Sequence, residues 1–195
     1  EASREPKEMS QLLPGPAVQG PPAPYCVAGI DPHKDFIAVA VLTPERVVRV
    51  GVIRCEPFVR LRRRLERALA DVRYVGIEWP YLGKSPHSYA TVLETAATVR
   101  TLVRLMGIPT VRVRGSQWMR VLKVRRRTRA YLKQAARRLA RRATRRSLTS
   151  DQSDAVCIGL WLLDRLVVHG RLDPPVPLLE RTGVRRGGQS NGVTK

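Results

Sequence analysis

Short runs of apolar residues, separated by polar turns, open the folded part of the chain. Three of them follow one another, at residues 25–31, 35–42 and 45–55. The first run ends in an acid, the second is apolar almost throughout, and the third alternates apolar and polar positions as strands do. Three consecutive strands joined by short turns predict an antiparallel meander.

After the third run, the spacing of the apolar residues changes to that of a helix. The residues at helical spacing are Phe58, Leu61, Leu65, Ala68 and Leu69. This helix is expected to cross over to a buried strand. The elements predicted from here on are a helix over 57–72, a strand over 72–79, a long helix over 85–107, a strand over 108–115 and helical structure over 116–168. The sequence therefore predicts an α/β protein with a five-stranded mixed sheet in the order βββαβαβα, flanked by helices.

Composition divides the chain into one folded unit and two flexible ends. A chain of 195 residues has the length of one domain. Residues 1–24 are dense in Pro, Gly and small polar residues, and residues 171–195 show no periodic face, so we expect a flexible leader and a flexible tail. Met9 is a candidate native start, which would make residues 1–8 an added segment. The folded unit is expected over residues 25–170.

Charge is the strongest feature of the composition. The chain has 36 Lys and Arg against 16 Asp and Glu, a formal net charge of +20, and a sequence pI near 11.3. Such an excess favours a polyanionic partner, most often nucleic acid, although a GC-rich genome alone would explain the preference for Arg over Lys. No apolar run is long enough to span a membrane, no signal pattern opens the chain, and the three scattered cysteines form no metal motif. We therefore expect a soluble, cytoplasmic protein that binds nucleic acid and has no membrane partner.

Four acids stand at the ends of apolar segments of this basic chain. In order, they close the first strand, close the fourth strand and share one face at the start of the last helix: Asp31, Glu78, Asp151 and Asp154. Each has an ordinary structural alternative, such as a turn former for Asp31, a partner of an Arg for Glu78 and a helix cap for Asp151. Together they favour a functional site, because strand ends and helix N-termini are where open α/β sheets gather functional side chains.

Four carboxylates can share one pocket only if cations neutralise them. Oxygen ligands of this kind suit Mg2+ or Mn2+, and a pair of such ions can activate a water and stabilise the leaving oxygen of a phosphodiester. An acidic metal centre within a strongly basic protein is the charge pattern of a nuclease.

Three short motifs occur in order along the chain: GID at residues 29–31, GIE at residues 76–78 and DxxDA at residues 151–155. With the element order between them, they resemble the RuvC-type Holliday junction resolvases of the ribonuclease H-like superfamily, over about residues 25–168. The resemblance implies a ribonuclease H-like fold and a homodimer that makes paired nicks across a four-way DNA junction, with two Mg2+ or Mn2+ ions per active site. The catalytic, metal-binding tetrad that it implies is Asp31, Glu78, Asp151 and Asp154.

The same resemblance points to further residues near the scissile phosphate. A base-stacking aromatic is expected shortly after the fourth strand, where Tyr81 is the candidate and Trp79 the competitor. Lys133 falls where the family has a catalytic lysine, and Arg120 stands where another lysine is expected. Because an Arg does not readily donate a proton, Arg120 is left with an electrostatic role.

A segment without acids extends over residues 112–146 and is crowded with Arg and Lys. Surface helices normally mix charge signs, so we expect the basic side of this segment to contact DNA phosphates. Its apolar stripe, which would pack inside, is Tyr131, Leu132, Ala135, Ala136, Leu139 and Ala143. The predicted DNA-binding residues, with Tyr81, are Arg120, Lys123, Arg125, Arg126, Arg127, Arg129, Lys133 and Arg137.

The long helix over 85–107 is similar in position to the dimerisation helix of the resolvases. Its apolar residues, among them Ala90, Leu93 and Ala97, either form a self-association stripe or cover the sheet.

Four other functions are compatible with parts of the pattern. The segment GIDPHKDFIAVAVL is similar to the opening of the DEDD transposases, whose further domain with a nucleophilic serine would need a longer chain. A ribonuclease H acting on RNA/DNA hybrids would use the same acids. An actin-like ATPase would need two glycine-rich phosphate loops and a duplicated domain, which the sequence does not show. A binding module that kept the fold without the chemistry is disfavoured by the presence of all four acids.

Overall fold

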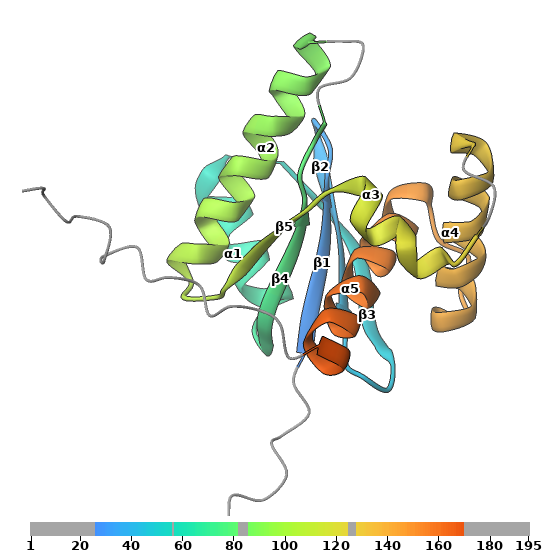
Figure 1. Cartoon of the computed structure of the whole chain (residues 1–195). Helices are drawn as coiled ribbons and strands as arrows, with labels where there is room; N and C mark the ends of the chain where they lie inside the picture. The colour runs from blue at the N-terminus through green and yellow to red at the C-terminus, as the bar shows by residue number, and fades with distance from the viewer. Residues whose placement is uncertain (1–25, 56, 82–85, 125–127, 170–195) are drawn as a thin grey trace, which may run out of the picture.

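Five strands form one mixed sheet in the order β3-β2-β1-β4-β5 (Figure 1). The computed structural model describes residues 26–55, 57–81, 86–124 and 128–169. The strands are β1 (Cys26–Pro32), β2 (Phe36–Leu42), β3 (Val47–Arg54), β4 (Val72–Glu78) and β5 (Thr110–Val113). β1 pairs antiparallel with β2, and β2 with β3, whereas β4 pairs parallel with both β1 and β5. The predicted meander, the crossover and the five-stranded mixed sheet are therefore confirmed.

Helices cover both faces of this sheet (Figure 1). On one face lie α1 (Phe58–Ala68) and α2 (Pro86–Leu105), and on the other lies α5 (Ser150–His169). α4 (Arg129–Thr144) packs against α5, and two short helices connect it to β5: α3 (Gly115–Trp118) and the 3-10 helix η1 (Met119–Leu122). The helical structure predicted over 116–168 is thus divided into separate helices, and the residue after η1 is Lys123, whose φ of 49° is left-handed.

The apolar residues of α1 and α2 pack on the sheet with one face of each helix. In α1, Leu61 and Leu65 are buried, whereas Phe58, on the predicted stripe, is 51% exposed. The buried residues of α2 are Ala96, Val99, Leu102 and Val103. Ala90 and Ala97 are exposed, so they do not cover the sheet.

The buried face of α4 is made of small residues. Ala135, Ala136 and Ala140 are buried there. Ala143, which the predicted stripe included, lies in the last turn of α4 and is exposed, so that part of the prediction is wrong.

Two glycines allow α5 to lie directly on the centre of the sheet. A Cβ on Gly29 of β1 would collide with the backbone oxygen of Ala155 and the backbone nitrogen of Gly159, both in α5. Gly76 of β4 pairs with Gly29 in the parallel ladder, and a Cβ there would lie 3.1 Å from the Ile158 side chain. Because side chains are absent at both positions, the start of α5 approaches the ends of β1 and β4.

None of the helices within the described ranges is long and apolar enough to cross a membrane. The predicted leader, 1–24, and the predicted tail, 171–195, lie outside the described residues.

Candidate metal centre

Strand register places the first two acids of the predicted tetrad side by side. Gly29 pairs with Gly76 and Ile30 with Ile77, so Asp31 and Glu78 occupy equivalent positions at the ends of neighbouring parallel strands. Successive side chains of a strand point to opposite faces, and the glycine two positions earlier in each strand faces α5. Both carboxylates therefore project from the face that α5 covers.

A capping box fixes the start of α5 and leaves its acids free. The Gln152 backbone N–H donates to Thr149 Oγ1 at 3.2 Å, and the Thr149 backbone N–H donates to Gln152 Oε1 at 3.1 Å. This is the reciprocal Thr-x-x-Gln arrangement of a helix N-terminus. Because Thr149 is the cap, the alternative of Asp151 as a capping residue is excluded, and the positive end of the helix dipole faces the acids.

Three of the acids meet within the reach of a single cation. One carboxylate oxygen from each of Asp31, Asp151 and Asp154 lies within 4.8 Å of the others, and all three residues are half-buried. Glu78 lies beside them, against the start of α3, where a Cβ on Gly115 would be 3.2 Å from Glu78 Oε1. The structure thus brings all four predicted acids to one edge of the sheet.

Burial and the neighbouring acids raise the pKa of three of these carboxyl groups. The pKa of Asp31 is raised well above its usual value, first by desolvation and then by the charges of Glu78, Asp154 and Asp151. Desolvation, together with Glu78 and Asp151, raises the pKa of Asp154 from 3.8 to about 7. Desolvation also raises the pKa of Glu78, opposed by Trp118 and by a hydrogen-bonding contact with Asp31. These shifts follow from the burial of several carboxyl groups close together.

Two basic side chains of α4 act on this cluster from its solvent side. Lys133 and Arg137 are both exposed. Lys133 lowers the pKa of Asp31 and of Asp154, and Arg137 lowers that of Asp154. Within the described ranges, no Lys or Arg forms an ion pair with any of the four acids. The two cations therefore moderate the negative potential without neutralising it.

The donor set fits a divalent cation. Asp154 Oδ1 is buried and has no hydrogen-bond partner among the described residues. An orphaned carboxylate oxygen of this kind is unfavourable unless something binds it. Carboxylate oxygens are the ligands that Mg2+ and Mn2+ prefer. Asp31, Asp151 and Asp154 are placed to hold one such ion, and Glu78 adds a fourth carboxylate beside Asp31.

Trp118 is a residue of this site that the sequence did not suggest. Its side chain is 4% exposed, and it lies close enough to Glu78 to lower the pKa of that carboxyl. Its indole Nε1 has no well-aligned hydrogen bond within the described part of the chain, so the contact with Glu78 is a loose one. No sequence motif indicates the role of Trp118. The capping box, in contrast, has a sequence pattern that could have been recognised, Thr149-x-x-Gln152.

The two candidate stacking aromatics differ in their surroundings. Trp79 is half-buried beneath the Arg112 guanidinium, whose central carbon lies 4.2 Å from the ring centroid. Tyr81 is 89% exposed at the end of the segment that follows β4. Only Tyr81 presents an open ring on which a base could stack.

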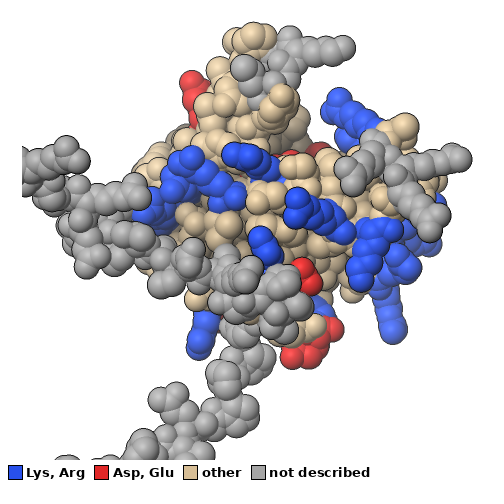
Figure 2. All heavy atoms as spheres, in the orientation of Figure 1, with Lys and Arg blue, Asp and Glu red and all other residues tan. Residues whose placement is uncertain are grey.

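The predicted DNA-binding residues spread over α4 and the segment before it. Arg129, Lys133 and Arg137 are exposed on α4, whereas Arg125, Arg126 and Arg127 lie outside the described residues. Lys and Arg side chains gather on the part of the surface where α4 lies (Figure 2). The outer face of the same helix has a cavity of about 520 Å³, and the described residues that line it are four arginines, Arg138, Arg141, Arg142 and Arg145.

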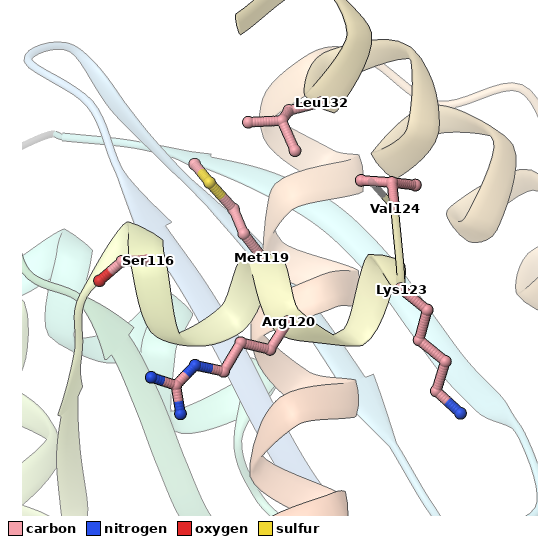
Figure 3. Close-up of a pocket in the computed structure, with 6 residues that line it drawn as sticks. All are labelled: Ser116, Met119, Arg120, Lys123, Val124 and Leu132. Atoms are coloured by element: carbon pink, nitrogen blue, oxygen red, sulfur yellow. The ribbon is translucent and has the colours of Figure 1, made fainter. Parts of the chain in front are cut away.

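Arg120 of η1 and Lys123, the residue after η1, lie beside the later part of α5, whereas Asp151 and Asp154 lie at its start. Together they line a cavity of about 380 Å³ with side chains from the middle of α5, Trp161 and Asp164 among them. They also border a cavity of about 560 Å³ between η1 and α4, into which Met119 points (Figure 3). Neither residue is among the charges that shift the pKa of Asp31, Glu78 or Asp154, in contrast to Lys133.

No protein-family model matches the chain, and none of the curated proteins matches it. Among solved structures, RuvC of T. thermophilus in complex with a Holliday junction substrate is similar, with a TM-score of 0.59 and 17% identity over 73% of this chain and 96% of that one. A second structure of Thermus thermophilus RuvC has a TM-score of 0.58, with 17% identity over 72% of this chain and 96% of that one. A Fowlpox virus resolvase with substrate Holliday junction DNA has a TM-score of 0.48, with 11% identity over 73% of this chain and 99% of that one.

The likeness to RuvC establishes the fold. The chain has the ribonuclease H-like fold of the RuvC-type resolvases, matched over nearly their whole length. The expected fold class is therefore confirmed.

Proposed function

We propose that this protein is a RuvC-type, metal-dependent endonuclease that resolves four-way DNA junctions by paired symmetric nicks. The observation that carries the proposal is the meeting of four carboxylates, none of them ion-paired with a described Lys or Arg, at one edge of a ribonuclease H-like sheet in a chain of net charge +20. A protein of the same fold, T. thermophilus RuvC, is described in complex with a Holliday junction substrate. The basic surface suits a polyanionic substrate, and the acidic centre suits a reaction that needs divalent cations.

The acids have the role of holding divalent cations. Asp31, Asp151 and Asp154 would share one Mg2+ or Mn2+ ion, and Glu78 beside Asp31 would help to hold a second. When bound, such ions supply a water of lowered pKa and positive charge for the phosphate oxygens. The raised pKa of Asp154, about 7, means that the ions must compete with protons for this ligand near neutral pH.

Lys133 and the basic residues around it orient the DNA. Lys133 is exposed and faces both Asp31 and Asp154, so its ammonium can contact a phosphate held at the centre and stabilise charge on the leaving oxygen. Arg137 lies on the same side. Arg120 and Lys123, beside α5, and Arg129, in α4, extend this basic surface, and Tyr81 provides the stacking ring. Arg125, Arg126 and Arg127, which lie outside the described residues, are proposed as further DNA contacts.

A homodimer is part of the same proposal, because two symmetric nicks need two active sites. Ala90 and Ala97 of α2 are exposed on the helix that packs against the sheet with its other face. Small exposed residues on a long helix would allow a second copy of this helix to approach closely. We assign this stripe to self-association.

The decisive experiment measures cleavage of labelled four-way junction, duplex, single strand and RNA/DNA hybrid in Mg2+, Mn2+ or EDTA. Paired symmetric cuts that are confined to the junction and need metal are expected. The variant Asp154→Asn should bind the junction and fail to cut it, whereas Asp164→Asn, an exposed acid on the same helix, should cut normally. Normal cleavage by Asp154→Asn would remove the tetrad from the proposal.

Two other results would assign the site differently. Cleavage of the hybrid alone would indicate a ribonuclease H, which uses the same acids. Tight junction binding without cleavage in either metal would indicate a binding module of this fold.

A further inference from the structure

Three arginines form a cluster on the face of the sheet opposite the acids. Val111 and Val113 of β5 pack toward α5, so Arg112 between them projects to the α2 side. There it lies near Arg100 and Arg104, one helical turn apart on α2. Desolvation lowers the pKa of the Arg100 guanidinium, and the charges of Arg112 and Arg104 lower it further. The three cations are therefore close enough to repel one another.

An aromatic ring holds one of them in place. The Arg112 guanidinium lies over the Trp79 ring at 4.2 Å from its centroid. The Trp79 backbone N–H donates to the Val113 carbonyl at 2.8 Å, which fixes the tryptophan to β5. A cation that stacks on an aromatic face keeps its edge N–H groups free for an acceptor.

No counter-ion satisfies the cluster among the described residues. The ion pairs there join Lys34 to Asp35, Arg49 to Asp71 and Arg62 to Glu66, so none involves the cluster. Arg100 Nε is buried and has no hydrogen-bond partner within the described ranges. A buried, unpaired donor beside two like charges is unfavourable in the absence of an anion, which would satisfy the donor and relieve the repulsion.

We propose that Arg100, Arg104 and Arg112 form a phosphate-binding site that holds a backbone phosphate of the DNA substrate at a position remote from the cut. Several guanidinium groups converging without a carboxylate suit a group with multiple anionic oxygens. The identification of DNA as its source rests on the proposed function.

The position of the arginine cluster agrees with a phosphate that belongs to the DNA substrate. Trp79, on which Arg112 stacks, directly follows Glu78 of the acid centre, and the exposed Tyr81 lies two residues beyond it. A DNA strand that passes over this edge of the sheet would meet the acid centre on the α5 side and the arginine cluster on the α2 side. The cluster would then fix the direction of the strand relative to the scissile phosphate.

The test compares Arg112→Gln and Arg100→Gln/Arg112→Gln with the control Arg60→Gln/Arg63→Gln. The control has the same charge change as the double variant, and its residues are exposed on α1. Binding of a labelled junction is measured in EDTA from about 50 to 200 mM salt, where each phosphate contact contributes about 0.9 to the slope of log K against log salt. The cluster variants should lose about one unit of slope, and the control should keep the wild-type slope. Because Arg112 is exposed, this single variant keeps the test valid if the double variant does not fold.

A second measurement uses inorganic phosphate in place of DNA. At equal ionic strength, phosphate should raise the unfolding temperature of the wild type more than chloride does, and Arg112→Gln should abolish the difference. If phosphate stabilises only the wild type while the junction slopes are equal, the site binds phosphate from another source and the DNA assignment is overturned. If the wild type binds no DNA at all, the proposed function fails and the phosphate measurement still decides whether the site exists. Equal slopes and no effect of phosphate would overturn the site itself.

Discussion

Replacing Asp154 by Asn should stabilise the metal-free protein while it abolishes cleavage. Burial and the neighbouring acids raise the pKa of Asp154 from 3.8 to about 7, so the folded state binds this proton more tightly than the unfolded state does. A carboxyl whose pKa is raised on folding destabilises the protein progressively as the pH rises from the unfolded pKa through the folded one. The penalty is therefore small in acid and complete above about pH 7.

The magnitude follows from the size of the shift. A shift of about three pKa units corresponds to about 4 kcal/mol at alkaline pH, since each unit is worth about 1.4 kcal/mol. Because the neighbouring acids share protons, we expect about 2 to 4 kcal/mol for the single variant. In a chain of this length, that is a rise of roughly 5 to 15 °C in the unfolding temperature.

The assay is thermal and urea unfolding of wild type and Asp154→Asn in EDTA, near pH 5 and near pH 8. The gain near pH 5 should be less than half of the gain near pH 8, because the wild-type carboxyl is largely protonated in acid. Mg2+ should stabilise the wild type and have a smaller effect on the variant. Asp164→Asn, at an exposed position of the same helix, is the control and should show no gain. Equal stability of wild type and Asp154→Asn in EDTA near pH 8, or a gain that does not depend on pH, would refute the reasoning.

Three further variants test how the site is built. Gly29→Ala should destabilise the fold by more than about 3 kcal/mol in urea, because its Cβ would meet the backbone of α5, whereas Gly51→Ala, with nothing within 4 Å of the new Cβ, should be tolerated. Thr149→Val should cost about 1 kcal/mol in the same assay through loss of the cap of α5, and unchanged stability would remove the capping box from the account. Tyr81→Ala should leave the unfolding temperature unchanged, since the side chain is 89% exposed, and weaken junction binding by about 1 to 3 kcal/mol; unaltered affinity would argue against stacking.

Hydrophobic spacing was sufficient to predict the sheet but not every buried position. The meander and the crossover follow from the strand period and from the change to helical spacing after residue 56. Ala143 has the correct helical spacing, yet it is exposed in the last turn of α4. Phe58 opens α1 at the correct spacing but is 51% exposed. Helical spacing identifies a face, whereas burial depends on how far the neighbouring element extends.

The four acids could be located from the sequence because each follows a recognisable local signal. Asp31 and Glu78 end apolar strands, and Asp154 follows the helix start. The contributions of Trp118 and of the arginine cluster could not be located in this way. Trp118 reaches Glu78 from a different element, and the cluster joins α2 to β5, so both depend on how separate elements pack together and not on a local pattern.

The arrangement of charge explains why the four acids of the centre form no ion pair with a described Lys or Arg, although the protein is rich in Arg. A guanidinium bonded to Asp31 or Asp154 would satisfy the carboxylate and compete with a metal ion for the same oxygens. Instead, Lys133 and Arg137 lie near enough to lower the pKa of Asp154 without forming an ion pair with it. They reduce the repulsion that folding must overcome while the ligand oxygens stay available. Stability of the metal-free protein is lower as a result, so a cation that binds the acids should also complete the fold around them.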